Sequence, residues 1–187
     1  GWRERTAACI RVALNDLGFA VFVPKHPGVD AGLLSMCADF SVPGRLALLP
    51  SAGGKTRYPE AGSRHLDGPE YSPDGAWLYF NTEEFASRPG HAQLARTPAE
   101  GGRIERLVES ESVDWFPHLS QDGELASYIS FPPGTLGHPP DVDVEVRLVR
   151  TANWREVVWR FPLYGGQGTI NVNSWSPDSR RFAFVAY

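Results

Sequence analysis

A tight turn that recurs along the chain is the feature that most limits how this sequence can fold. It first stands at residues 72–75 as Ser-Pro-Asp-Gly and is followed at 77–82 by Trp-Leu-Tyr-Phe-Asn-Thr. Proline presets φ at about −65°, aspartate can bond its own backbone, and glycine accepts the positive φ that leads into the next strand. The alternation and aromatic content of 77–82 are typical of a packed strand. Residues 68–82 therefore predict two strands joined by a turn.

The turn returns twice, as Ser-Gln-Asp-Gly at 120–123 and as Ser-Pro-Asp-Ser at 176–179. A second kind of hairpin alternates with it, at 46–58, 92–108 and 144–161. The serines that open the turns are 48 and 56 residues apart, and an insertion at 131–140 explains the longer interval. A repeat of about 50 residues with two hairpins is typical of a four-stranded propeller blade. We predict blades over 65–111 and 113–162, with half-blades at 45–58 and 165–187.

The first 44 residues have a different pattern. Apolar residues at helical spacing predict a helix over 5–17, and a short apolar run predicts a strand over 19–23. Residues 33–40 fit either a helical turn or a strand. We therefore expect a short N-terminal α/β segment, 1–44, before an all-β region that covers 45–187.

Composition excludes several classes of function. The net charge is −4 and the lysines and arginines are not clustered, so we expect no nucleic-acid partner. The apolar runs are far shorter than the roughly 18–20 residues of a spanning helix, so we expect no membrane span. Cys9 and Cys37 lack metal-ligand spacing, which argues against a zinc site or a disulfide framework. No signal sequence is visible in the chain.

The repeats resemble the TolB-like β-propeller family, whose WD40-like (PD40) repeat centres on a Ser-Pro-Asp-Gly turn followed by an aromatic strand. The resemblance covers about 45–187 and is carried by residues 67–75, by 115–118 with the downstream Gln-Asp-Gly, and by 165–171 with 174–178. It implies a binding or scaffold module that recognises a protein or peptide partner, rather than an enzyme. It also implies a place in the bacterial cell envelope, in the periplasm.

The blade count leaves the architecture of the whole molecule open. Two blades and two half-blades make about three four-stranded blade equivalents, a partial β-propeller, whereas closed propellers have about four to eight blades. The chain could be a truncated propeller fragment without independent function, or an open stack of sheets capped by residues 1–44. It could also be a half-ring that forms a homodimer, because two copies would supply the six blades that the family uses.

Polar residues near the inner strands are the candidates for ligand binding. In propellers, loops at one end of these strands line the mouth of the central channel and commonly hold ligands. Neutral amides and a histidine suit hydrogen bonding to a peptide or a sugar, and a histidine with a glutamine could also hold a divalent metal. The same residues could instead satisfy backbone groups between blades. The candidates are His118, Gln167, Asn171, Asn173, Asp67 and Glu70, and the sequence assigns no catalytic residue, metal ligand or cofactor.

Other motifs give weaker indications of function. A carbohydrate-active propeller, a lyase or glycosidase, is the rival hypothesis and would use His118 with a nearby acid. Lys55 and Thr56 follow two glycines but lack the first glycine of a phosphate-binding loop, and no Gly-x-Ser-x-Gly motif occurs. The acids at 141, 143 and 145 alternate with valines, which predicts the solvated face of a strand rather than a cation site.

Overall fold

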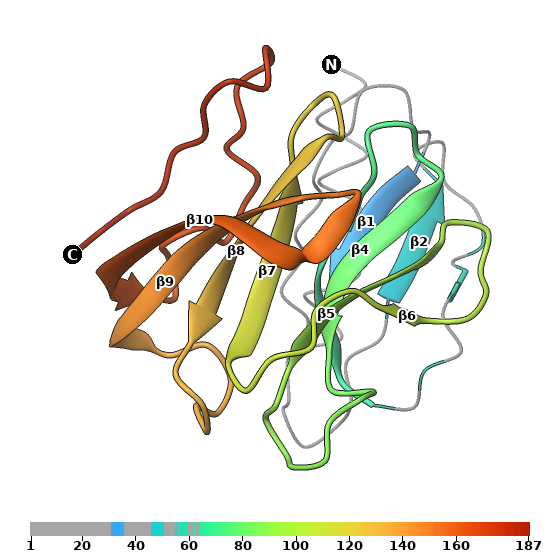
Figure 1. Ribbon diagram of the computed structural model, residues 1–187. Coiled ribbons are helices and arrows are strands. Elements are labelled where there is room, and N and C mark those ends of the chain that lie inside the picture. The colour runs from blue at the N-terminus through green and yellow to red at the C-terminus, as the bar shows by residue number, and fades with distance from the viewer. Residues whose placement is uncertain (1–30, 36–45, 51–54, 56, 60–61, 63) are drawn as a thin grey trace, which may run out of the picture.

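The computed structural model describes residues 31–35, 46–50, 55, 57–59, 62 and 64–187 (Figure 1). These residues form ten β-strands, and no helix occurs among them. The helix expected over 5–17 and the strand expected over 19–23 lie outside the described residues. In the described part of the chain, no helix is long and apolar enough to cross a membrane.

Blade one is an antiparallel sheet of four strands in the order β3 (Leu66–Tyr71), β4 (Trp77–Thr82), β5 (Gln93–Pro98) and β6 (Glu105–Arg106). The predicted turn joins β3 to β4. The Ser72 hydroxyl donates to Asp74 Oδ1 at 2.5 Å, and Gly75 N donates to the Ser72 carbonyl at 2.8 Å. Gly75 has a φ of 72°, which confirms why glycine stands at this position.

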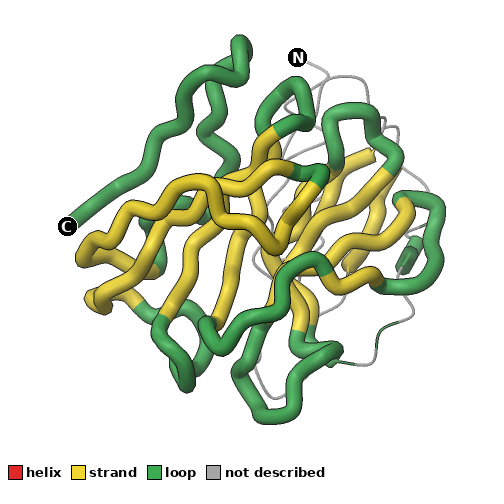
Figure 2. Tube along the Cα trace, viewed as in Figure 1, coloured by secondary structure: helices red, strands yellow, loops and turns green. Residues whose placement is uncertain are grey.

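Blade two repeats this arrangement with β7 (Val113–Leu119), β8 (Leu125–Phe131), β9 (Pro140–Arg150) and β10 (Asn153–Gly166). Its first turn also closes through a hydroxyl, because Ser120 Oγ donates to Asp122 Oδ1 at 2.6 Å. The insertion forms the loop between β8 and β9, as predicted. Both sheets run in chain order from the first strand outward, and short turns and loops join neighbouring strands (Figure 2).

Parts of two further blades flank these sheets. β1 (Ala31–Ser35) and β2 (Leu46–Pro50) pair antiparallel, so residues 33–35 are strand rather than helix. A bridge between Leu48 and Arg57 pairs the two arms of the hairpin predicted over 46–58. At the other end, a bridge between Trp175 and Phe182 encloses the third turn. The fold is therefore an all-β partial propeller of about three blade equivalents.

Three apolar clusters fill the spaces between successive sheets. Leu46 and Leu48 of β2 pack with Phe80 of blade one, while Tyr79 of blade one packs with Tyr128 of blade two. A third cluster joins blade two to the last segment of the chain, through residues that include Ile129 and Ile170. The strand aromatics contribute most of this packing. Tyr79, Phe80, Tyr128, Phe131 and Trp175 are buried, and Trp77, Phe182 and Phe184 are half-buried.

Candidate ligand-binding site

The first strands of the two blades share an irregularity that aims the candidate side chains. The pairing register shifts between Asp67 and Glu70 in β3, and between Trp115 and His118 in β7. Gly68 and Phe116 occupy equivalent places in these bulges, with φ values of 58° and 56°. Such a φ is rare for a bulky residue and typically costs about 1–3 kcal/mol, so the surrounding packing must hold Phe116 there.

Crowding explains the glycine in the first bulge. A Cβ at position 68 would lie 2.6 Å from Asn81 Oδ1 and 2.8 Å from the Phe116 ring. The Phe116 N–H donates to the same Asn81 oxygen at 3.3 Å. The two bulges are therefore packed against each other across the boundary between the blades.

His118, Glu70 and Asn173 form one hydrogen-bonded network, although they come from β7, β3 and the segment after β10. His118 Nδ1 lies 2.7 Å from Glu70 Oε2, and Nε2 lies 2.5 Å from the Ile170 carbonyl. Glu70 Oε1 accepts from Leu119 N at 2.8 Å and from Asn173 Nδ2 at 2.6 Å. His118 and Glu70 are buried, being 6% and 8% exposed. The network therefore ties two blades to the last segment of the chain.

Each ring nitrogen of His118 faces an oxygen, one from a carboxyl group and one from a carbonyl. With both nitrogens engaged inside the protein, His118 has no free nitrogen to offer a substrate or a metal in this arrangement.

Trp175 extends the network toward blade two. Its indole N–H lies 3.1 Å from the His118 carbonyl and 3.2 Å from Ser127 Oγ. Its backbone N–H donates to Asn173 Oδ1 at 2.9 Å. In this network, polar side chains satisfy backbone groups between blades. This is the second of the two interpretations that the sequence allows for the candidate residues.

The other three candidates have separate surroundings. Asp67 is buried in β3, where its Oδ1 accepts from Gly68 N at 2.7 Å. Gln167 and Asn171 are exposed on the segment after β10. Gln167 N donates to the Pro139 carbonyl at 3.0 Å, and Asn171 Oδ1 accepts from Gly168 N at 2.8 Å.

A group near the beginning of β3 and β7 was not singled out from the sequence. The His138 ring lies 4.6 Å from the Trp115 ring and 5.0 Å from the Phe116 ring, measured between centroids. Within the described residues, Asn81 Nδ2, Trp115 Nε1 and His138 Nδ1 are buried without a hydrogen-bond partner. Burial lowers the pKa of His138, which favours the neutral ring. We call Asn81, Trp115 and His138 the mouth group.

Two signals in the sequence could have pointed to the mouth group. Asn81 is an amide in a strand made mainly of aromatic and apolar residues, where a buried polar group requires a partner. His138 is the one ionisable side chain in the Pro- and Gly-rich insertion at 131–140. Neither position belongs to the repeated turn, so the repeat itself gives no indication of them.

The acids of β9 lie on the solvated face of the strand, as predicted. Asp141 and Asp143 are exposed, whereas Val144 and Val146 are buried. Glu145 accepts from Arg147 Nε at 2.7 Å. Across the part of the chain that the structure describes, no three His, Cys, Asp or Glu side chains are grouped so as to hold a metal ion.

Comparison with known sequences shows that the chain is similar to part of a longer protein. No protein-family model matches the chain. An uncharacterized protein of Agrobacterium fabrum is 42% identical over 136 residues, which cover 73% of this chain and 44% of that protein. The chain therefore spans less than half the length of this relative.

Solved structures share the fold. A TolB-like protein of Agrobacterium tumefaciens aligns with a TM-score of 0.62 and 30% identity, covering 87% of this chain and 72% of that one. TolB of Acinetobacter baumannii aligns with the same TM-score at 18% identity, over 87% and 36% of the two chains. An oligogalacturonate lyase in complex with manganese aligns with a TM-score of 0.53 at 12% identity, over 83% and 49%. The last two comparisons concern the fold alone.

Proposed function

From the premise that the chain belongs to the TolB-like β-propeller family, we propose that it is a non-enzymatic binding module that recognises a protein or peptide partner. The observation that carries the proposal is the mouth group. Three buried polar nitrogens at the beginning of the inner strands have no partner among the described residues. Buried polar groups are normally hydrogen-bonded, so such a cluster is a natural place for an incoming ligand to complete the hydrogen bonding.

The chemistry of the mouth group suits a peptide. Asn81 Nδ2 and Trp115 Nε1 are donors, and peptide carbonyls are acceptors. The rings of Trp115, Phe116 and His138 add an apolar surface beside these donors. Leu136, on the same loop as His138, is 72% exposed and offers an apolar anchor to a partner. A partner would displace the His138 ring from Trp115 to reach the buried donors.

The exposed candidates belong to the rim of the same region. The bond from Gln167 N to the Pro139 carbonyl places the segment after β10 against the loop that carries His138. Gln167 and Asn171 are exposed there and have amide groups that can pair with a peptide backbone. Under this proposal, Asp67, Gln167 and Asn171 contact the partner, while Glu70, His118 and Asn173 hold the blades in place.

Peptide binding by the whole protein tests the proposal. A peptide selected from a displayed random library would be titrated calorimetrically into wild type and into His138→Ala, Gln167→Ala and Asn171→Ala. Each substitution at the mouth should weaken binding by about tenfold, or about 1.4 kcal/mol. Asn153→Ala, at the beginning of β10, is the control and should bind as wild type does. Equal affinity in all four variants, or no selectable peptide, would reject the proposal.

The carbohydrate-active alternative requires His118 to transfer a proton to or from a substrate. Both ring nitrogens of His118 are held within the protein, which supports the binding module over a lyase or glycosidase. A panel of polysaccharides incubated with wild type and with His118→Gln tests this directly. Turnover that disappears in the variant, with peptide binding intact, would show that the binding proposal is wrong.

We also propose a periplasmic location, because the solved relatives are TolB and TolB-like proteins. Fractionation of the native host with antibodies against the protein tests this, and recovery in the cytosolic fraction would reject it. The homodimer with a six-bladed ring stays a prediction, which light scattering of the whole protein would check. In the Agrobacterium fabrum relative, 44% of the length is matched, so that single chain has room for further blades without a second copy.

A further inference from the structure

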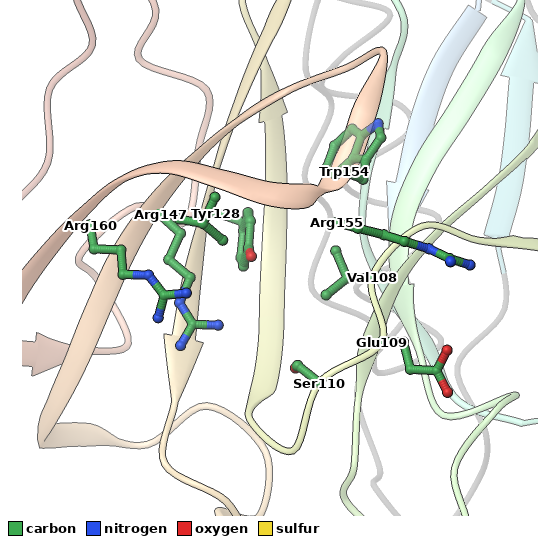
Figure 3. Close-up of a pocket in the computed structure, with 9 residues that line it drawn as sticks. Val108, Glu109, Ser110, Tyr128, Arg147, Trp154, Arg155 and Arg160 are labelled. Atoms are coloured by element: carbon green, nitrogen blue, oxygen red, sulfur yellow. The ribbon is translucent and has the colours of Figure 1, made fainter.

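A cavity of about 290 Å³ lies between the two blades and shares no lining residue with the mouth group (Figure 3). Blade one contributes Val108 and Ser110 from the segment that follows β6. Blade two contributes Tyr128 from β8, Arg147 from β9 and several residues of β10. The volume is close to the lower limit for small-molecule sites, about 300 Å³.

Irregular pairing in β10 directs an unusual set of side chains to this cavity. A regular strand shows alternate residues on each face, so 154, 156, 158 and 160 would share one face. Instead the register shifts between Asn153 and Val157 and again between Val157 and Trp159. Trp154, Arg155, Val157 and Arg160 consequently all line the cavity. Strand irregularities that re-aim side chains in this way are common beside binding sites.

Three arginines line the cavity, whereas Glu109 is the one acid among its lining residues. Arg147 Nε lies 2.7 Å from Glu145 Oε2, and Arg160 Nη1 lies 3.5 Å from the same oxygen. One carboxylate oxygen is therefore shared by two guanidinium groups. Arg155 has no carboxylate within ion-pair distance among the described residues. The lining acid Glu109 is paired with Arg106 at 3.4 Å.

Arg147 is held in position from behind. Its side chain is 12% exposed, and Nη1 lies 3.8 Å from the fully buried Asp114. Asp114 in turn accepts from Ser110 Oγ at 2.7 Å and from Ser130 Oγ at 2.6 Å. Burial raises the pKa of the Tyr128 hydroxyl to about 12, so this group remains a donor at neutral pH. The cavity thus presents hydrogen-bond donors on a prepositioned frame.

Figure 3 shows how the charges are distributed. The guanidinium groups of Arg147 and Arg160 lie together on one side, and Arg155 extends to the opposite side. Val108 lies between them. Val157 also lines the cavity and adds apolar surface to it. Two cationic positions separated by an apolar surface match a molecule with two acidic groups on a short carbon chain.

We propose that this cavity binds a small organic dicarboxylate, with one carboxylate at Arg147 and Arg160, the other at Arg155, and the carbon chain on Val108 and Val157. Guanidinium forks pair with carboxylates through two parallel hydrogen bonds, which favours this ligand class. The site is independent of the proposed peptide mouth, because the two share no residue. Loss of one activity would therefore leave the other in place.

Calorimetric titration of the whole protein with succinate, glutarate and adipate tests the proposal. At least one acid should bind with a Kd below about 1 mM at low salt and should weaken as salt is added. The corresponding diamide should bind at least about tenfold more weakly, because it lacks the charge. Inorganic phosphate should also bind more weakly, because it lacks the carbon spacer.

Variants locate the site. Arg155→Ala and Arg160→Ala should each weaken binding of the best acid by about tenfold, since both side chains are exposed and neither is part of the buried frame. Arg150→Ala, another exposed arginine of blade two, is the matched control and should bind as wild type does. The proposal is overturned if no acid binds, if the diamide or phosphate binds as tightly, or if all three variants bind equally.

Discussion

Replacing His118 with alanine is expected to lower the free energy of unfolding by about 3–5 kcal/mol, because it removes one partner of a buried hydrogen-bonded pair and leaves the Glu70 carboxyl group incompletely paired. Two features of the structure explain why the expected loss is large. The substitution removes the contacts to Glu70 at 2.7 Å and to the Ile170 carbonyl at 2.5 Å. It leaves the carboxyl group of Glu70, which is 8% exposed, with only the donors from Leu119 and Asn173.

This loss is large beside the total stability of a domain, about 5–15 kcal/mol. For a protein of this size, about 2–4 °C of melting temperature is lost per kcal/mol, so His118→Ala should melt about 6–20 °C lower. Urea unfolding followed by tryptophan fluorescence measures the free energy. Trp175, whose indole donates to the His118 carbonyl, is a suitable reporter.

A double-mutant cycle separates the His118–Glu70 interaction from packing. Glu70→Leu and His118→Leu should each be strongly destabilising, because each leaves the other polar group buried and unpaired. The double variant should be more stable than the sum of the two effects predicts, by about 2–3 kcal/mol. Glu124→Ala, on the exposed turn between β7 and β8, serves as the control. A loss below about 1 kcal/mol for His118→Ala, with no coupling in the cycle, would refute the account of the network.

Two further predictions concern the bulge and the buried acid. Gly68→Ala should destabilise the protein by more than about 1 kcal/mol, because its φ is 58° and a Cβ would lie 2.6 Å from Asn81 Oδ1. Gly134→Ala, at a φ of 84° with open space around the Cβ, should lower the free energy of unfolding by less. Equal losses for the two variants in urea unfolding would show that crowding is not the cause. Burial raises the pKa of Asp114, so its protonated form favours the folded state. Its contribution is therefore complete below the ordinary value of 3.8 and is lost as pH rises through the higher folded pKa. Asp114→Asn should remove this loss of stability with rising pH. Urea unfolding at several pH values measures it, and the same loss in wild type and variant would contradict the prediction.

Local signals account for the parts of the fold that could be predicted. The repeated turn specifies its own geometry through a serine hydroxyl, an aspartate and a residue that accepts positive φ, and all of these lie within a few residues. Strand alternation then fixes which side chains face the core. The blade boundaries follow from these two signals because each blade is a continuous stretch of chain. The pairing of β1 with β2 involves residues beyond the repeat, which is why the sequence over 33–40 fits either a helical turn or a strand.

The candidate site could be predicted only in part. Glu70 and His118 occupy equivalent positions of successive repeats, 48 residues apart, so their proximity follows from the stacking of blades. Asn173 has no equivalent polar partner in the other repeats, and its contact depends on the path of the segment after β10. His138 lies in the insertion, which follows no repeat pattern. The direction of its ring is decided by packing against Trp115, which no spacing in the sequence reveals.

The network around Glu70 also has a consequence for how the protein assembles and unfolds. The side-chain and backbone groups that meet its carboxylate oxygens come from later parts of the chain: His118 and Leu119 of blade two, and Asn173 beyond it. While only blade one has folded, this carboxylate must stay hydrated, and the boundary between blades must stay open to water. Stacked repeats would otherwise gain stability one neighbour at a time. Here Asn173, in the segment after β10, donates a hydrogen bond to Glu70 of blade one. The blades are therefore expected to lose their structure together in a single cooperative transition.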